Sequence, residues 1–359
     1  MGSALVLIGL IAAYVMAGAH TFNLVELAQF DFPENFQKWA FPLVFVGFAI
    51  LAGLWPFHTW APTGHVAAPT AASMLLAGVV MKLGAYGALR VAMTLFPKGL
   101  AAWQGVFAVL ALIGILYGAM VALVQKDVKF VIGYSSVSHM GFVLLGLMTL
   151  TTIGLSGAVL QMFSHGIIAG LLFGVVGRMV YDRTHTRQLD ELQEMRLNRA
   201  IPFAAVSFVV AGLASMGMPG FSGFVAELQV LIGAWKAFQT FPAFPTLAVL
   251  AGLGILIGVA YTLRAIQKAF FSGDPEPSAG AGASAFSERA GSNPGRDGQE
   301  NPLKEQHRFE DISVPERVGA AMLMATTLAV GIYPRLLLDL IEPALHTPLM
   351  SRLVGGGVP

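Results

Sequence analysis

The sequence predicts an all-α protein, a polytopic bundle of about nine transmembrane helices of which two are broken within the membrane. Of the 359 residues, 56% are hydrophobic and only 11% are charged, and the mean hydropathy is +0.71. Apolar runs of roughly 18 residues or more, enough to cross about 30 Å of hydrocarbon, recur along most of the chain. Two of these runs contain clusters of glycine and proline. Together these features exclude a soluble globular domain.

The apolar runs place the spans in order along the chain. They lie near residues 3–19, 41–70, 72–96, 102–124, 129–150, 153–180, 200–236, 246–270 and 316–334. Residues 1–20 lack the basic start and the small-residue cleavage site of a signal peptide, so we interpret them as the first span. Residues 273–302 are rich in Gly, Pro, Ser and charge, which predicts a disordered cytoplasmic loop.

The two breaks are "GLWPFHTWAPTGHVAAPT" at Gly53 to Thr70 and "GMPGFSGF" at Gly217 to Phe224. Proline removes a backbone donor and glycine loosens a helix, so we expect both stretches to be non-helical at membrane depth. Irregular backbone is tolerated there only where it faces protein or a hydrated cavity. Two broken helices in one chain are typical of transporters.

The placement of positive charge predicts the orientation. With nine crossings, most of the Lys and Arg residues fall on one side, which should be cytoplasmic. This places the N-terminus inside and the C-terminus outside. The net charge of only +1 suggests no nucleic-acid partner, and the lack of cysteine excludes thiolate-held iron–sulfur clusters and disulfides from this chain.

Two of the charged residues in the apolar runs, Lys82 and Glu227, are flanked by long apolar stretches on both sides, where charge is costly. Lys82 is about nine residues, or roughly 14 Å, from the nearer helix end, which is too deep for its stem to reach water. Glu227 follows the second break and is flanked by apolar residues on both sides. A snorkelling lysine and a helix-start carboxylate are the simpler interpretations. The depth of both residues in the membrane instead favours the interpretation that they gain and lose protons during function.

Four histidines lie within the predicted spans. His139 and His165 lie on consecutive helices, with Ser135, Ser136, Ser138, Gln161 and Ser164 nearby. These two histidines, with bound water, are candidates for a proton bridge between Lys82 and Glu227; ligation of a b-type haem is the less favoured alternative. His58 and His65 fall in the first break, where lining an aqueous vestibule and capping loop backbone both remain open.

Several long strings closely resemble the antiporter-like membrane subunit M of respiratory NADH:quinone oxidoreductase, complex I. They are "PFHTWAPTGHVAAPTAASMLLAGVVMKLGAYGALR", "QKDVKFVIGYSSVSHMGF", "GAVLQMFSHG" and "YDRTHTR". The family fold has fourteen helices with two inverted five-helix repeats, each containing one broken helix. The resemblance places Lys82, His139, His165 and Glu227 on the family's proton-pathway positions.

The chain departs from the family pattern in its first repeat. Leu51 stands where the family carries a lysine, and "PTGH" replaces a "PDAH"-like turn. The helices that normally precede residue 1, including one with a partner glutamate, are missing from this sequence. We therefore expect an N-terminally shortened chain with four parts: the remainder of the first repeat at 1–96, the second repeat at 97–270, a flexible loop at 271–315, and a last helix with its tail at 316–359.

The resemblance implies a proton-translocating subunit of an enzyme, the NADH:quinone oxidoreductase translocase, in a bacterial plasma membrane. This chain would hold no redox centre or cofactor, because NAD, flavin, iron–sulfur clusters and quinone belong to partner subunits. The implied partners are L-like and N-like antiporter subunits, small K-like and J-like subunits, and lipid. Alternatives are a subunit of a multisubunit cation/proton antiporter or membrane-bound hydrogenase, and a structural paralogue that no longer conducts.

Overall fold

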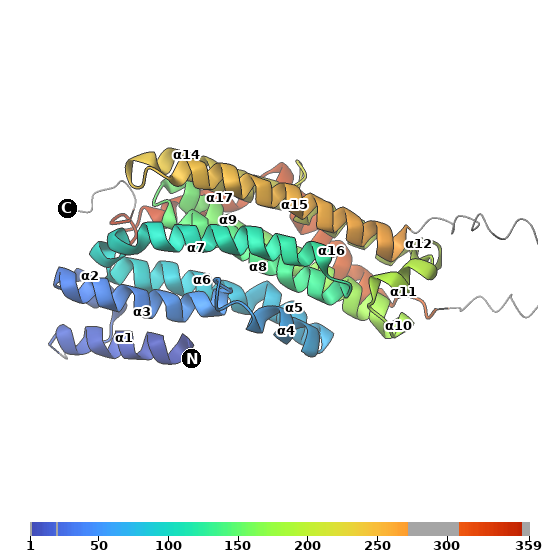
Figure 1. Cartoon of the computed structure of the whole chain (residues 1–359), viewed down its shortest axis with the longest axis horizontal. Coiled ribbons are helices and arrows are strands. Elements are labelled where there is room, and N and C mark those ends of the chain that lie inside the picture. The colour runs from blue at the N-terminus through green and yellow to red at the C-terminus, as the bar shows by residue number, and fades with distance from the viewer. Residues whose placement is uncertain (1, 19–20, 272–308, 354–359) are drawn as a thin grey trace, which may run out of the picture.

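The chain folds into a bundle of long helices that run side by side along the longest axis of the molecule (Figure 1). The structure, a computed structural model, describes residues 2–18, 21–271 and 309–353. Within these residues it is helical with no β-strand, which confirms the predicted class. The predicted loop at 273–302 lies outside the described residues.

We call each helix, or pair of helices in line, that traverses the bundle a pass. The passes of the first part are α1 (Gly2–Met16), α3 (Glu34–Ala52) with α4 (Trp60–Ala67), and the continuous run of α5 (Thr70–Leu75), η1 (Leu76–Val80), α6 (Met81–Gly87) and η2 (Ala88–Met93). The next are α7 (Pro97–Val124), α8 (Val128–Met148), α9 (Thr152–Gly174) continued by η3 (Val175–Tyr181), α13 (Pro202–Ser215) with α14 (Ser222–Lys236), α15 (Phe244–Phe270), and α16 (Val314–Ile332) with α17 (Arg335–Leu345). Short connecting elements are α2 (Leu24–Gln29), α10 (Asp182–Thr184), α11 (Leu189–Glu194), α12 (Leu197–Ala200) and η4 (Ala237–Gln239).

All nine predicted spans coincide with passes of this bundle. Among the described residues, six helices are long and apolar enough to cross a membrane, and the bent pair α16 and α17 makes a seventh. Helices α1 and α13 are apolar but shorter, with 15 and 14 residues. Pass α8 is the central one, since 89% of its apolar window is buried inside the bundle.

The first break is shorter than the sequence predicts. Helix α3 ends at Ala52 and is capped by Gly53, which adopts a left-handed conformation with φ of 87° and donates its N–H to the carbonyls of Ala49 and Ile50. The chain resumes a helix at Trp60, whose indole donates back to the Ile50 carbonyl at 2.7 Å. The expectation that all of 53–70 is non-helical was therefore wrong for α4. Pro62 lies in the first turn of α4, where a missing N–H costs nothing.

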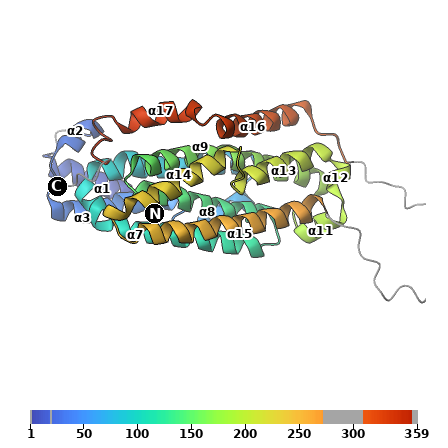
Figure 2. The same cartoon turned by 90° about the horizontal axis from the view of Figure 1, so that it is seen from above.

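The second break has the expected irregular backbone at 217–221, whereas residues 222–224, also expected to be non-helical, form the first turn of α14. Gly217 and Gly220 have φ of 71° and 98°, values that favour glycine. Helix α13 runs toward this break from the end of the bundle that carries α11 and α12 (Figure 2). Helix α4 terminates at that same end, whereas α3 approaches the first break from the opposite end (Figure 1). The two broken passes thus run in opposite directions, which agrees with inverted repeats, while the repeat boundaries stay a prediction.

A third broken pass was not predicted. Helices α16 and α17 meet at an angle of 69° near Pro334, and α17 occupies part of the region assigned to a tail. The sequence signal for α17 is weak because it carries Arg335, Asp339 and Glu342 and is apolar along one side only.

Basic side chains join several passes at one end of the bundle, which we call the basic end. Arg187 pairs with Asp127 at 2.6 Å and donates to the Val66 carbonyl at the end of α4. Lys268 at the end of α15 pairs with Asp190 at 2.6 Å, and this hydrogen bond and the nearby positive charge lower the pKa of the exposed Asp190 carboxyl. These contacts fix the ends of α4, α8 and α15 relative to one another.

Candidate functional site

Lys82 lies in the interior of the bundle, 8% exposed, on helix α6. Its Nζ is 2.7 Å from Nδ1 of His165 on α9 and also donates to the carbonyl of Ala77 in the π-helical segment η1. π-helical turns inside helices are frequent at functional sites. The predicted buried position of Lys82 is confirmed, and its partners are a histidine and a backbone carbonyl.

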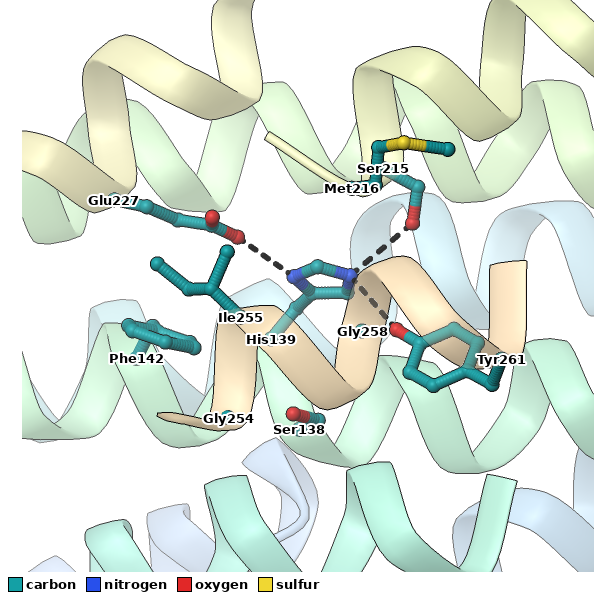
Figure 3. A pocket seen from close by; sticks show the side chains of 10 residues that line it. All are labelled: Ser138, His139, Phe142, Ser215, Met216, Glu227, Gly254, Ile255, Gly258 and Tyr261. Carbon is teal, nitrogen blue, oxygen red and sulfur yellow. Dashed lines mark hydrogen bonds and ion pairs between the residues drawn. The ribbon is translucent and has the colours of Figure 1, made fainter. Parts of the chain in front are cut away.

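Glu227 is 3% exposed and lies on α14, two turns after the second break. Its Oε1 is 2.9 Å from Nδ1 of His139 on α8 and accepts a hydrogen bond of 3.2 Å from Nε2 of Gln161. Figure 3 shows the Glu227 carboxyl and the His139 ring directed toward each other. A buried carboxylate held by two donors is satisfied without leaving the bundle.

The second nitrogen of His139 faces two hydroxyls. Its Nε2 lies 3.2 Å from Ser215 Oγ and 3.5 Å from the Tyr261 hydroxyl (Figure 3). When Glu227 is ionised it can only accept, so Nδ1 of a neutral His139 carries the proton and Nε2 accepts from the hydroxyls. A cavity of about 10 Å³ beside these groups is close to the smallest space that holds one water molecule.

The two pairs, Lys82 with His165 and His139 with Glu227, lie next to each other. The rings of His139 and His165 are 5.2 Å apart between centroids and tilted by 35°. A small hollow touches both rings and is too narrow to admit a water molecule or a porphyrin. Gln161 Oε1 and Ser164 Oγ are buried without a hydrogen-bond partner among the described residues. The four titratable groups therefore form two bonded pairs with a gap between them.

Glycines allow the helices that carry these groups to approach. A Cβ on Gly166 would lie 2.7 Å from the Gly78 carbonyl oxygen, so α9 and η1 touch through backbone. Gly166 directly follows His165, and Gly78 precedes Lys82 by one turn. A Cβ on Gly217 would lie 2.9 Å from Glu227 Oε2, so the second break also touches the carboxyl. Small residues at such crossings are typical of membrane helices.

The serines near His139 donate to backbone carbonyls. Ser135 and Ser136 donate to the Ile132 carbonyl, and Ser138 donates to the Ile115 carbonyl at 2.9 Å. They satisfy backbone groups within and between helices, although Ser138 also lines the cavity. Sequence reasoning missed Ser215 and Tyr261. The available signal was a hydroxyl within an apolar run, just before the second break for Ser215 and inside α15 for Tyr261.

The first break carries fewer polar contacts. His65 is fully buried, its ring stacks on Phe173 with centroids 4.8 Å apart, and neither ring nitrogen has a hydrogen-bond partner among the described residues. His58 is buried against Tyr117. Leu51 lies near the end of α3, where its backbone would touch a Cβ on Gly84 of α6 at 3.0 Å. The residue in the family's lysine position is thus apolar and adjoins the helix of Lys82.

These features define a multi-pass membrane protein whose broken helices surround buried, paired titratable groups. The chain is similar to known proteins. The family described as "NADH:quinone oxidoreductase/Mrp antiporter, TM" matches residues 1–254. NADH-quinone oxidoreductase subunit M of Rhodobacter capsulatus is 35% identical over 358 residues, which is 96% of this chain and 62% of that relative.

Two solved complexes contain chains of the same shape. A chain of respiratory complex I from Thermus thermophilus with bound NADH aligns with 99% of this chain and 67% of its own length, with a TM-score of 0.81 and 30% identity. A chain of the Mrp complex from Dietzia sp. DQ12-45-1b aligns with 99% of this chain and 68% of its own length, with a TM-score of 0.78 and 26% identity.

The chain belongs to the NADH:quinone oxidoreductase/Mrp antiporter transmembrane family. Its similarity to proteins named subunit M confirms the resemblance predicted from the sequence. The chain spans less than two thirds of the length of the curated relatives it matches, 62% for the Rhodobacter protein.

Proposed function

We propose that this chain carries protons across the membrane as a subunit of an NADH:quinone oxidoreductase complex. The observation that supports this most directly is the row of buried titratable groups, in which Lys82 contacts His165 and His139 contacts Glu227. Costly buried charges are retained in membrane helices mainly at ion pathways and proton relays.

In the proposed mechanism, Lys82 holds the proton, His165 and His139 pass it on, and Glu227 delivers it to the exit side. A positive charge on one buried group disfavours a second positive charge beside it, since the interior screens charge poorly. A proton that arrives at Lys82 therefore favours loss of the proton held by the next group. Closing the gap between the two rings, through side-chain motion or an entering water, completes the transfer.

The remaining parts of the proposal concern the assembly. We propose that the basic end faces the bacterial cytoplasm, in line with the excess of Lys and Arg there. The flavin, iron–sulfur clusters, NAD and quinone would be bound by partner subunits. The neighbours of this bundle in the membrane would be L-like, N-like, K-like and J-like subunits. Electron transfer in those partners would drive the changes in charge and hydration along this chain.

The test is the proton-to-electron stoichiometry of the purified complex in liposomes. Lys82→Met and Glu227→Gln should each lower the stoichiometry while the complex assembles and still transfers electrons. Lys38→Met and Glu194→Gln are matched controls, because both residues lie at the surface. These two variants should leave the proton-to-electron stoichiometry unchanged. Unchanged stoichiometry in both buried-site variants would show that the chain is a scaffold.

A second candidate is a subunit of a cation/proton antiporter. It is supported by the alignment of 99% of this chain with a chain of the Mrp complex. Sodium flux driven by a pH gradient in the same liposomes distinguishes the antiporter from the oxidoreductase subunit. Sodium movement without electron transfer, lost in Glu227→Gln, would favour the antiporter.

A further inference from the structure

The third broken pass lies against the second break. Figure 2 shows α16 and α17 following each other along one side of the bundle, over α9, α13 and α14. The bend between α16 and α17 begins after Ile332, and Gly331 in the last turn of α16 contacts the irregular segment between α13 and α14. Two breaks in two different passes are therefore in direct contact.

The contact at Gly331 involves backbone on both sides. A Cβ on Gly331 would lie 2.2 Å from the Gly220 carbonyl oxygen and 2.4 Å from the Phe221 Cα, against 3.4–4 Å for ordinary van der Waals contact. No flexible side chain is available there to move aside. Only glycine at this position allows α16 to reach the break.

One turn earlier, a hydroxyl pair joins α16 to the first residue of α14. Thr327 Oγ1 and Ser222 Oγ are 2.9 Å apart, and both residues are at most 1% exposed. Beside them Val330 packs with Leu160 and Ala226 in a separate apolar cluster. A polar bond, a backbone contact and apolar packing thus hold the start of α14 against α16.

The other end of α16 is also fixed. Glu316 forms a capping box with Ser313 and pairs with Arg183 at 3.0 Å, with both side chains of the pair at most 10% exposed. Arg183 also donates to the carbonyls of Glu310 and Asp311. Helix α16 is anchored at the basic end by these contacts, and its other end contacts the second break.

The break in turn determines where the Glu227 carboxyl lies. Ser222 and Glu227 belong to the same rigid helix α14, and Gly217 of the break touches Glu227 Oε2. A shift of α14 by about 1 Å would lengthen the 2.9 Å contact between Glu227 and His139 beyond hydrogen-bonding distance.

We propose that α16 is the positioning element of the second break, and that Gly331 and Thr327 are the residues through which it holds Glu227 against His139. This inference rests on the proposed proton-carrying role of Glu227. Neither residue touches the titratable groups, so both act through the backbone of the break and the start of α14.

The test compares variants of α16 in the whole purified complex. Gly331→Ala removes the backbone contact, and Gly319→Ala is its control on the same helix, since nothing lies within 4 Å of a Cβ there. Thr327→Val keeps the shape and loses the hydroxyl, and Thr327→Ser restores the hydroxyl. Thr326→Val is the control for Thr327→Val, because the Thr326 hydroxyl bonds within its own helix to the Met322 carbonyl.

The first readout is the infrared difference band of the Glu227 carboxyl, identified by its loss in Glu227→Gln. The second is the proton-to-electron stoichiometry. We expect Gly331→Ala and Thr327→Val to shift the band and to lower the proton-to-electron stoichiometry, because a misplacement of about 1 Å can slow a positioned step by about a hundredfold. The two control variants and Thr327→Ser should match the unaltered protein in both readouts.

An unaltered Glu227 band in Thr327→Val overturns the inference, and this variant decides the matter if Gly331→Ala does not assemble. A shifted band that Thr327→Ser fails to reverse also overturns it, because the hydroxyl would then not be the cause. The proposed function fails separately, if Glu227→Gln itself keeps full stoichiometry.

Discussion

Replacing Gly166 by alanine tests whether the contact between Lys82 and His165 is used. The added Cβ would lie 2.7 Å from the Gly78 carbonyl oxygen, whereas ordinary contact begins at 3.4 Å. The two backbones have to separate by about 0.7 Å, since neither can rotate away. Because Lys82 and His165 belong to these two helices, we expect the distance between their side chains to increase by the same amount.

The expected effect on the pair follows from that displacement. The distance from Lys82 Nζ to His165 Nδ1 rises from 2.7 Å to about 3.4 Å, outside the range of a good hydrogen bond. A hydrogen bond to a charged group contributes about 1.5–3 kcal/mol, so the population of the bonded pair should fall by roughly tenfold to a hundredfold. Proton translocation should decrease toward the level of Lys82→Met.

Two measurements on the purified complex check this expectation. Electron cryo-microscopy of Gly166→Ala gives the Lys82 to His165 distance, and liposome assays give the proton-to-electron ratio. Gly170→Ala is the control one turn along α9, where nothing lies within 4 Å of a Cβ. A distance that stays at its present value refutes the steric argument. A longer distance with full proton pumping refutes the role of the pair.

Two further predictions concern stability. A Cβ on Gly233 would lie 2.3 Å from the Gly154 Cα, so Gly233→Ala should destabilise the contact of α14 with α9 by about 1–3 kcal/mol and lower the melting temperature of the complex; an unchanged melting temperature contradicts this. Glu316 pairs with both Arg183, whose side chain is 7% exposed, and Arg178, which is 63% exposed; Arg183→Met should therefore lower stability more than Arg178→Met, which should cost about 0–1 kcal/mol. Thermal denaturation measures both, and equal losses would show that burial does not set the cost.

The sequence alone could predict the parts of the fold that depend on local physics. Long apolar runs located the passes, and glycine with proline located the two breaks, because these residues act within their own helices. Lys82 and Glu227 stood out because a charge in an apolar run is costly wherever the neighbouring helices lie. The helix α4 inside the first break was missed, since Pro62 is harmless in a first turn.

The pairing of the site residues depends on tertiary packing and could not be predicted from the residues. Whether Ser138 faces the cavity or bonds to Ile115 is decided by how closely α8 approaches α7. Tyr261 joins the site only because α15 packs beside α8. No local pattern in the chain encodes these helix-to-helix distances.

The gap between His165 and His139 has a consequence for energy storage under the proposed function. A membrane potential exerts about 2.3 kcal/mol per 100 mV on each charge that crosses. A continuous file of bonded groups would let protons run back down that gradient and dissipate it as heat. With the ring centroids 5.2 Å apart and no hydrogen bond between the two rings among the described residues, the resting arrangement would interrupt such a file and so preserve the gradient.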